Sequence, residues 1–259
     1  MYRRREIEAA GRRLSGISPK FGGAYRTSEL EERPRTGLEF SMLIGFKSFL
    51  PRADERNVQS RVETSDIYFS ADVETDGPIP GPYSILSFAM VYAGSFDGHN
   101  FRRPENYDRV FYRELMPISD NFQKEALDIN GLDRDRLCVE GLDPETAMTE
   151  AFHWINSNTG DAKPVLVAYP LSFDWTWLYW YFIQYCKAGS PFDYSRCFDV
   201  KTAVAVKAGI PISAAGRSKL DSSLSSKRPH THHAVDDAIE QAEIFANVFE
   251  WGGVRGGTF

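Results

Sequence analysis

Two carboxylates stand one residue apart inside an apolar run that has the pattern of a buried strand. Asp72 and Glu74 lie in the stretch FSADVET. Because side chains alternate across a strand, both carboxylates point to the same face. Buried charges require a partner, and two neighbouring oxygen donors suit a hard divalent cation such as Mg²⁺ or Mn²⁺. The residues alone leave a salt-bridged surface pair open as the alternative.

Two more acidic positions follow later in the chain. Asp174 comes just after a short apolar run, in the first turn of an expected helix, where the helix dipole favours an anionic side chain. Asp236 and Asp237 open a late helix, behind a segment that holds three of the five histidines, His230, His232 and His233. For both positions the alternative is ordinary helix capping, in the second case beside a solvated loop.

The elements that must position these residues follow from the apolar pattern. Strands are expected at 66–73, 84–93, 109–116 and 163–170. Helices are expected at 119–132 (with Ser119 as N-cap), 143–158, 172–189, near 199–209 and at 235–250. Three strands followed by alternating helices and a strand predict a mixed α/β sheet covered by helices.

The first 61 of the 259 residues are basic, whereas the rest of the chain is acidic. Residues 1–61 carry 13 Lys/Arg against 8 Asp/Glu, although the whole chain has a formal charge of −6. We predict a basic, poorly ordered extension at 1–61, a main domain at 62–252 and a tail at 253–259; a basic arm that contacts nucleic acid is the alternative for the extension. An acidic main domain argues against a protein that coats nucleic acid by neutralising phosphates.

Cysteine usage and hydropathy bear on location. The three cysteines form no CxxC pair and no disulfide-like framework, which favours a reducing compartment. No apolar run reaches the roughly 18 residues that span a bilayer, and the basic N-terminus lacks the apolar segment of a secretory signal. The sequence predicts a cytoplasmic protein with no membrane partner.

Three motifs taken together carry a resemblance that none carries alone. DxET at 72–75, FD at 173–174 and HxAxxDA at 232–238 occur in this order. The chain resembles the DEDDh family of 3′–5′ exonucleases, which includes the proofreading subunit of bacterial DNA polymerase, ribonuclease T and oligoribonuclease. The resemblance spans residues 64–250. It implies a ribonuclease H-like fold, a mixed five-stranded sheet flanked by helices, with 62–252 as the exonuclease domain.

The resemblance also implies roles by position. Two Mg²⁺ or Mn²⁺ ions would be held by the carboxylates of Asp72, Glu74, Asp174 and Asp237. His232, five residues before Asp237, matches the general base, while His233 stands where a variant of the family has a tyrosine, and His230 remains a loop residue. Substrate contacts are expected from Thr75 and Phe173.

The implied activity is hydrolysis of phosphodiester bonds at a single-stranded or frayed 3′ end, with release of nucleoside 5′-monophosphates. DNA is favoured over RNA, because no dedicated reader of the 2′-hydroxyl is evident, and the resemblance extends to bacterial anti-phage defence. The alternatives are an exoribonuclease that trims short RNA and a non-catalytic module that binds 3′ ends or a polymerase partner. The second should have lost a metal carboxylate, and none is missing.

Three segments carry expectations of their own. Tyr169 and Pro170 replace a His-Asn pair common in relatives, which affects substrate preference more than metal binding. The loop DGPIPGPYS, stiffened by three prolines, is expected to form one rim of the site. The Ser-rich segment 213–233 is either a mobile loop that delivers His232 or a solvent-exposed linker. Helical spacing predicts that four aromatic-run side chains are core, namely Trp177, Leu178, Tyr181 and Phe182.

Overall fold

A computed structural model of the chain describes residues 65–253. The extension predicted for 1–61 lies outside the described residues, as does all of the predicted tail except its first residue.

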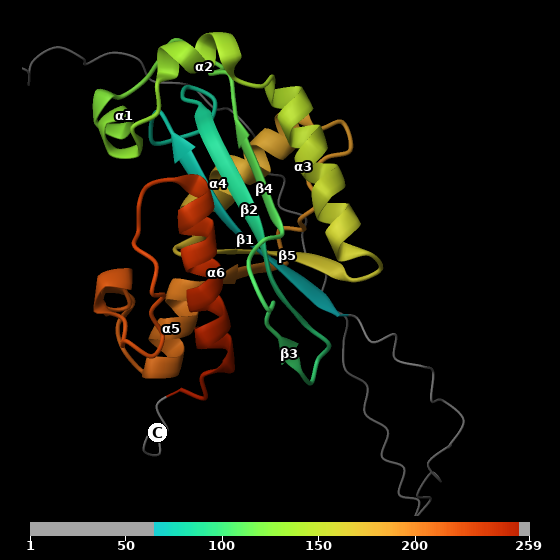
Figure 1. Ribbon diagram of the computed structural model, residues 1–259, viewed down its shortest axis with the longest axis vertical. Helices are drawn as coiled ribbons and strands as arrows, with labels where there is room; N and C mark the ends of the chain where they lie inside the picture. The colour runs from blue at the N-terminus through green and yellow to red at the C-terminus, as the bar shows by residue number, and fades with distance from the viewer. Residues whose placement is uncertain (1–64, 254–259) are drawn as a thin grey trace, which may run out of the picture. The chain divides into compact units, whose positions relative to one another are not determined.

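A mixed sheet forms the centre of the described part (Figure 1). β1 (Asp66–Thr75) pairs antiparallel with β2 (Ile85–Phe96) and parallel with β5 (Lys163–Ala168). β6 (Cys197–Asp199) extends the sheet beyond β5, while β3 (Phe101–Arg102) and β4 (Val110–Glu114) both pair with β2. The predicted mixed sheet is confirmed in class; it has six strands, and the short strands β3 and β6 lie outside the four predicted strand ranges.

Helices cover both faces of the sheet, with α3 and α4 on one face and α5 and α6 on the other (Figure 1). The short helices α1 and α2 lie beyond the end of β1. The bounds are α1 (Lys124–Asn130), α2 (Arg134–Glu140), α3 (Pro144–Thr159), α4 (Leu171–Tyr185), α5 (Val200–Ala208) and α6 (Ala234–Glu250). Two single 3₁₀ turns, at Ile212–Ala214 and Arg217–Lys219, lie between α5 and α6.

The apolar face of α4 packs as the helical spacing predicts. Its four core side chains are fully buried, Trp177, Leu178, Tyr181 and Phe182. A second core lies on the opposite face, where α5 and α6 cover the sheet. Because the helices bury both faces, polar residues inside the sheet are exceptions that need a physical reason.

The helix predicted at 119–132 is wrong in its first half. The Ser119 hydroxyl donates a hydrogen bond to the Pro82 carbonyl at 2.6 Å, so this residue fastens a loop, and α1 begins only at Lys124. A further helix, α2, was not predicted. Its N-cap is Asp133, whose carboxylate accepts a hydrogen bond from the Arg136 backbone amide at 3.0 Å. No helix within residues 65–253 is long and apolar enough to cross a membrane.

Candidate active site

Asp72 and Glu74 project from β1 toward the first turn of α6. One carboxylate oxygen from each of them and one from Asp237 all lie within 4.8 Å of one another. The side chain of Val73, between the two acidic residues, points to the opposite face and packs in the core beneath α4. The strand therefore presents both acids on one side, as the alternation predicts.

Asp174 reaches the same place from the other face of the sheet. It lies in the first turn of α4 and is 6% exposed, and its Oδ1 accepts a hydrogen bond from the Val73 backbone amide at 3.2 Å. The start of α4 is fixed by Asp199, whose carboxylate accepts a hydrogen bond from the Leu171 amide at 2.6 Å. The amide that Asp174 binds belongs to the residue between Asp72 and Glu74, so the fourth acid joins the cluster.

Burial and mutual repulsion make these acids weak. Burial raises the pKa of Asp72 well above its usual range, and the charges of Asp174, Glu74 and Asp237 raise it further. Burial, followed by the charges of Asp237 and Asp174, raises the pKa of Glu74 to about 8. Burial raises the pKa of Asp174 to about 7, against the opposing effect of backbone hydrogen bonds and Arg217. The cluster carries more negative charge than its surroundings offset.

The donor set fits divalent metal ions. Arg217 lowers the pKa of both Asp72 and Asp174. One guanidinium among four clustered carboxylates leaves negative charge that hard cations with oxygen ligands would offset.

Asp237 links this cluster to the histidine segment. It is 1% exposed; its Oδ1 accepts a hydrogen bond from the Thr231 amide at 2.8 Å, and its Oδ2 accepts one from the His232 amide at 2.9 Å. The backbone of His232 has a φ of 58°, in the left-handed region that histidine adopts more readily than most residues. The turn brings the loop backbone against the carboxylate, so Asp237 anchors the histidine segment.

The three histidines occupy different places. One ring nitrogen each from His230 and His232 lies with an Asp237 oxygen in a group whose members are all within 4.8 Å. His233 instead stacks on the ring of Tyr112 and lies 3.8 Å from the exposed carboxylate of Asp236. His230 lies in the loop, as expected, and its Nδ1 lies 3.0 Å from Asp237 Oδ2.

Three polar residues that support the cluster were not predicted. Gln241 is fully buried and bridges two elements: its Oε1 accepts from the Tyr169 amide at 2.6 Å, and its Nε2 donates to Asp72 Oδ1 at 2.8 Å. Arg217 forms an ion pair with Glu240 at 3.0 Å. Gln241 and Glu240 stand four and three residues after Asp237, on neighbouring positions of the same helix face, and this spacing could have indicated them.

Tyr169 binds the segment between α5 and α6. It is 4% exposed, and its hydroxyl donates to the Ala215 carbonyl at 2.8 Å. Its own carbonyl accepts a hydrogen bond from Arg217 Nη2 at 3.0 Å. Through these two hydrogen bonds Tyr169 holds the segment between α5 and α6 beside the carboxylate cluster.

The two predicted substrate contacts differ in access. Thr75 is 7% exposed, and its hydroxyl donates to the Gly77 carbonyl at 2.8 Å, so it stabilises the following loop. Phe173 is 41% exposed, next to Asp174, and is more open than a residue that only packs the strand-to-helix corner. Of the two, Phe173 has its ring available to a ligand.

The loop after Glu74 is rigid for several reasons. Asp76 is fully buried and forms an ion pair with Arg134 at 3.0 Å, while its Oδ1 accepts from the Ser84 amide at 2.5 Å. A Cβ at Gly77 would lie 2.2 Å from the Tyr83 ring, so only glycine fits there. The loop is therefore held both by its own residues and by Arg134 of α2.

Solved structures share this fold. The nuclease domain of 3′hExo, a DEDDh family member bound to rAMP, matches with a TM-score of 0.54 and 12% identity, over 73% of this chain and 94% of that one. A 3′-exonuclease in specific recognition of a histone mRNA stem-loop matches with a TM-score of 0.53 and 13% identity, over 72% and 83%. At these identities the likeness shows the fold, which is the predicted ribonuclease H-like one.

Sequence comparison goes further. Residues 134–249 match the family model described as the 3′-5′ exoribonuclease Rv2179c-like domain. The Escherichia coli protein named 3′-5′ DNA exonuclease Cap18 is 36% identical over 186 residues, which are 70% of this chain and 90% of that protein. The chain belongs to this family of 3′–5′ exonucleases. The predictions of DEDDh membership and of a hydrolytic enzyme are confirmed, and divalent metal use is general among such exonucleases.

Proposed function

We propose that the chain is a two-metal-ion 3′–5′ exonuclease that removes nucleoside 5′-monophosphates from single-stranded or frayed 3′ ends, with DNA as the preferred substrate. One observation carries the proposal. The oxygens of Asp72, Glu74 and Asp237 lie within 4.8 Å of one another, and Asp174 is bonded to the strand between the first two. These are the four acids of the exonuclease motifs.

Each residue has a part in this proposal. The carboxylates of Asp72, Glu74, Asp174 and Asp237 would hold two Mg²⁺ or Mn²⁺ ions, because hard oxygen donors suit these cations. When bound, such ions offset the charge of the scissile phosphate and of the departing oxygen. His232 would accept the proton of the attacking water as a general base. Phe173 would contact the terminal nucleotide, and Thr75 would stabilise the loop that follows β1 through its hydrogen bond to the Gly77 carbonyl.

The choice of His232 over His233 rests on their surroundings. A ring nitrogen of His232 lies in the group around Asp237, whereas His233 stacks on Tyr112 and is not a member of that group. The ring of His230 also lies in this group, with its Nδ1 3.0 Å from Asp237 Oδ2. Its Nδ1 also contacts Arg217 and Glu240, which favours a structural part for this third histidine.

DNA is proposed as substrate because the Escherichia coli relative, matched over 90% of its length, is named a DNA exonuclease. An exoribonuclease is the second candidate, because the family model that matches residues 134–249 is described as one. A cytoplasmic location is proposed from the three free cysteines, Cys138, Cys186 and Cys197. A part in anti-phage defence stays a prediction.

The test is a degradation assay with single- and double-stranded DNA and RNA of one sequence, labelled at the 5′ end to follow shortening or at the 3′ end to follow the released nucleotide, in Mg²⁺, Mn²⁺ or EDTA. We expect a ladder that shortens from the 3′ end, mononucleotide products, faster loss of DNA than of RNA, and no reaction in EDTA. Asp237→Ala should abolish the ladder. Activity in EDTA would contradict the metal roles, and faster loss of RNA would favour the second candidate.

A further inference from the structure

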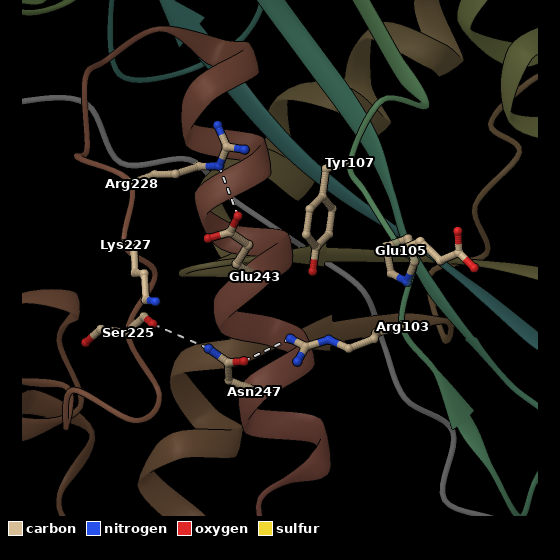
Figure 2. Close-up of a pocket in the computed structure, with 9 residues that line it drawn as sticks. Arg103, Glu105, Tyr107, Ser225, Lys227, Arg228, Glu243 and Asn247 are labelled. Carbon is tan, nitrogen blue, oxygen red and sulfur yellow. Dashed lines mark hydrogen bonds and ion pairs between the residues drawn. The ribbon is translucent and has the colours of Figure 1, made fainter.

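A polar pocket lies beside α6, away from the carboxylate cluster. It has a volume of about 570 Å³ and lies between the loop after β3, the segment before the histidines and the middle of α6. Figure 2 shows the side chains that line it, drawn from all three elements. Three of them are basic, Arg103, Lys227 and Arg228.

Most of the negative charge in this pocket is already satisfied. Glu243 accepts a hydrogen bond from the Ser226 hydroxyl at 2.5 Å through one oxygen, and forms an ion pair with Arg228 at 3.0 Å through the other. Glu105 directs its carboxylate away from the basic groups (Figure 2). Arg103 forms an ion pair with Glu250 at 3.4 Å, so among the described residues Lys227 is the basic side chain of the pocket that has no acidic partner.

Two donors in the pocket lack a partner. Within residues 65–253, no ion pair or hydrogen bond engages the exposed ammonium group of Lys227. The Tyr107 hydroxyl is buried and has no hydrogen-bond acceptor among these residues, since the neighbouring Arg103 guanidinium can only donate; Figure 2 shows the hydroxyl turned toward the space between Glu243 and Arg103. A buried hydroxyl without a partner is unfavourable, so it marks a place where a ligand acceptor fits.

The pocket and the carboxylate cluster are joined by one segment. Residues 224–232 run antiparallel along α6: the Asn247 amide donates to the Leu224 carbonyl at 3.3 Å near one end, and the His232 amide donates to Asp237 at 2.9 Å at the other. In between, His230 lies 3.1 Å from Glu240. A nucleic-acid strand that left the carboxylate cluster along this segment would next meet the basic side chains of the pocket.

The distance along α6 from Asp237 to the pocket indicates which nucleotides of a bound nucleic-acid strand would lie in the pocket. Glu243 and Asn247 follow Asp237 by six and ten residues, which at a rise of 1.5 Å per residue is about 9 and 15 Å. A stacked strand carries one phosphate for roughly every 3.4 Å. We propose that the pocket binds the phosphate backbone of the substrate strand about three to four nucleotides from the scissile bond, an inference that rests on the proposed function.

The test compares long and minimal substrates. The double variant Arg103→Gln/Lys227→Gln removes two positive charges, and Lys227→Gln alone touches no contact among the described residues. The control Lys187→Gln removes an exposed lysine from the end of α4, on the other face of the sheet. Substrates are 5′-labelled oligonucleotides of 2 to 12 nucleotides and the p-nitrophenyl ester of thymidine 5′-monophosphate.

For the unaltered protein we expect KM to fall with length until about five nucleotides. In the double variant, KM for the 12-mer should rise at least tenfold, with kcat and hydrolysis of the ester unchanged. The slope of log KM against log[salt] should become shallower by about 1.4, since each single-strand phosphate contact contributes about 0.7. Lys227→Gln should show about half of that change in slope, and Lys187→Gln none.

Equal losses for the dinucleotide and the 12-mer, or a salt slope that stays at the value of Lys187→Gln, would overturn the pocket proposal. A protein that hydrolyses neither the ester nor any oligonucleotide would instead overturn the proposed function. In that case the pocket proposal is tested by fluorescence anisotropy with a labelled 12-mer. The double variant should bind this oligonucleotide at least tenfold more weakly than the unaltered protein. Equal binding by the double variant and the control would contradict it.

Discussion

The acids near the end of β1 fall into two groups, a buried one that is paired with a cation of the protein and two half-buried ones that are not. Asp76 is fully buried, but Arg134 pairs with it and the Ser84 amide donates to it. Asp72 and Glu74, at most four residues earlier, form no ion pair within residues 65–253; Asp72 accepts a hydrogen bond from Gln241, and both gain further acids from α4 and α6. A carboxylate with a protein cation holds a loop in place, and carboxylates without one are available to bind ions.

Asp72→Ala should give the largest effect on activity and an opposite effect on stability. Turnover should fall by more than about 10⁴-fold, because a metal ligand is lost. The metal-free protein should become more stable, since the variant removes an acid from a repulsive cluster. Rates from single-turnover assays and melting temperatures in EDTA check both parts. If the metal-free variant is less stable than the unaltered protein, then protein groups stabilise the Asp72 carboxylate without any bound ion, which contradicts this prediction.

Variants of His232 and His233 test which histidine acts as the general base beside the carboxylate cluster. His232→Ala should lower kcat by about 10²–10⁴-fold, the usual contribution of a general base, with the metal concentration for half-activation little changed. His233→Ala, which removes only the stacking on Tyr112 and the exposed contact with Asp236, should change kcat by less than about threefold. A larger loss in the second variant would transfer the proposed role to His233.

Much of this arrangement follows from the sequence, and the exceptions share a cause. The strand that carries Asp72 and Glu74 and the core face of α4 are local patterns of period 2 and 3.6, which the chain displays directly. The start of α1 was wrong because Ser119 bonds the Pro82 carbonyl, 37 residues away, and a tertiary contact overrides a local capping preference. Local patterns do not contain such contacts.

The same limit explains the residues missed around the cluster. Arg217 reaches Glu240 from 23 positions away, and Arg134 reaches Asp76 from 58. Nothing in the residues near Arg134 distinguishes it from an ordinary surface arginine of a short helix. Gln241 is different, because a polar side chain one turn after Asp237 on a buried helix face could have been noticed.

Asp76→Ala should show the reverse pattern to Asp72→Ala. It leaves the Arg134 guanidinium, whose side chain is 10% exposed, without its partner. Breaking a buried ion pair in this way destabilises a protein by about 3–5 kcal/mol, which lowers Tm by roughly 6–20 °C for a domain of this size. Calorimetry in EDTA measures the change, and the loss should appear whether or not metal is added.

Lys124→Ala is the matched control for the loop. It removes the exposed Lys124–Asp128 pair on α1, in the region that the Asp76–Arg134 pair fastens. An exposed pair contributes about 0–1 kcal/mol, so Tm should change by no more than about 4 °C. If the two variants melt alike, the buried pair does not hold the loop.

The smallest effect expected is a dependence of stability on pH in the absence of metal. In the folded protein Glu74 has a pKa of about 8 and Asp174 of about 7, whereas both titrate near 4 when unfolded. The folded state therefore binds more protons between about pH 4 and 8, and stability falls as the pH rises through this range. In EDTA, Tm should drop by at least about 3 °C from pH 5 to pH 8. Mn²⁺ should reverse the drop, because ions bind the deprotonated acids, and Glu74→Gln should reduce it. A Tm that stays level over this range would mean that protein groups already balance the cluster, as Arg134 balances Asp76.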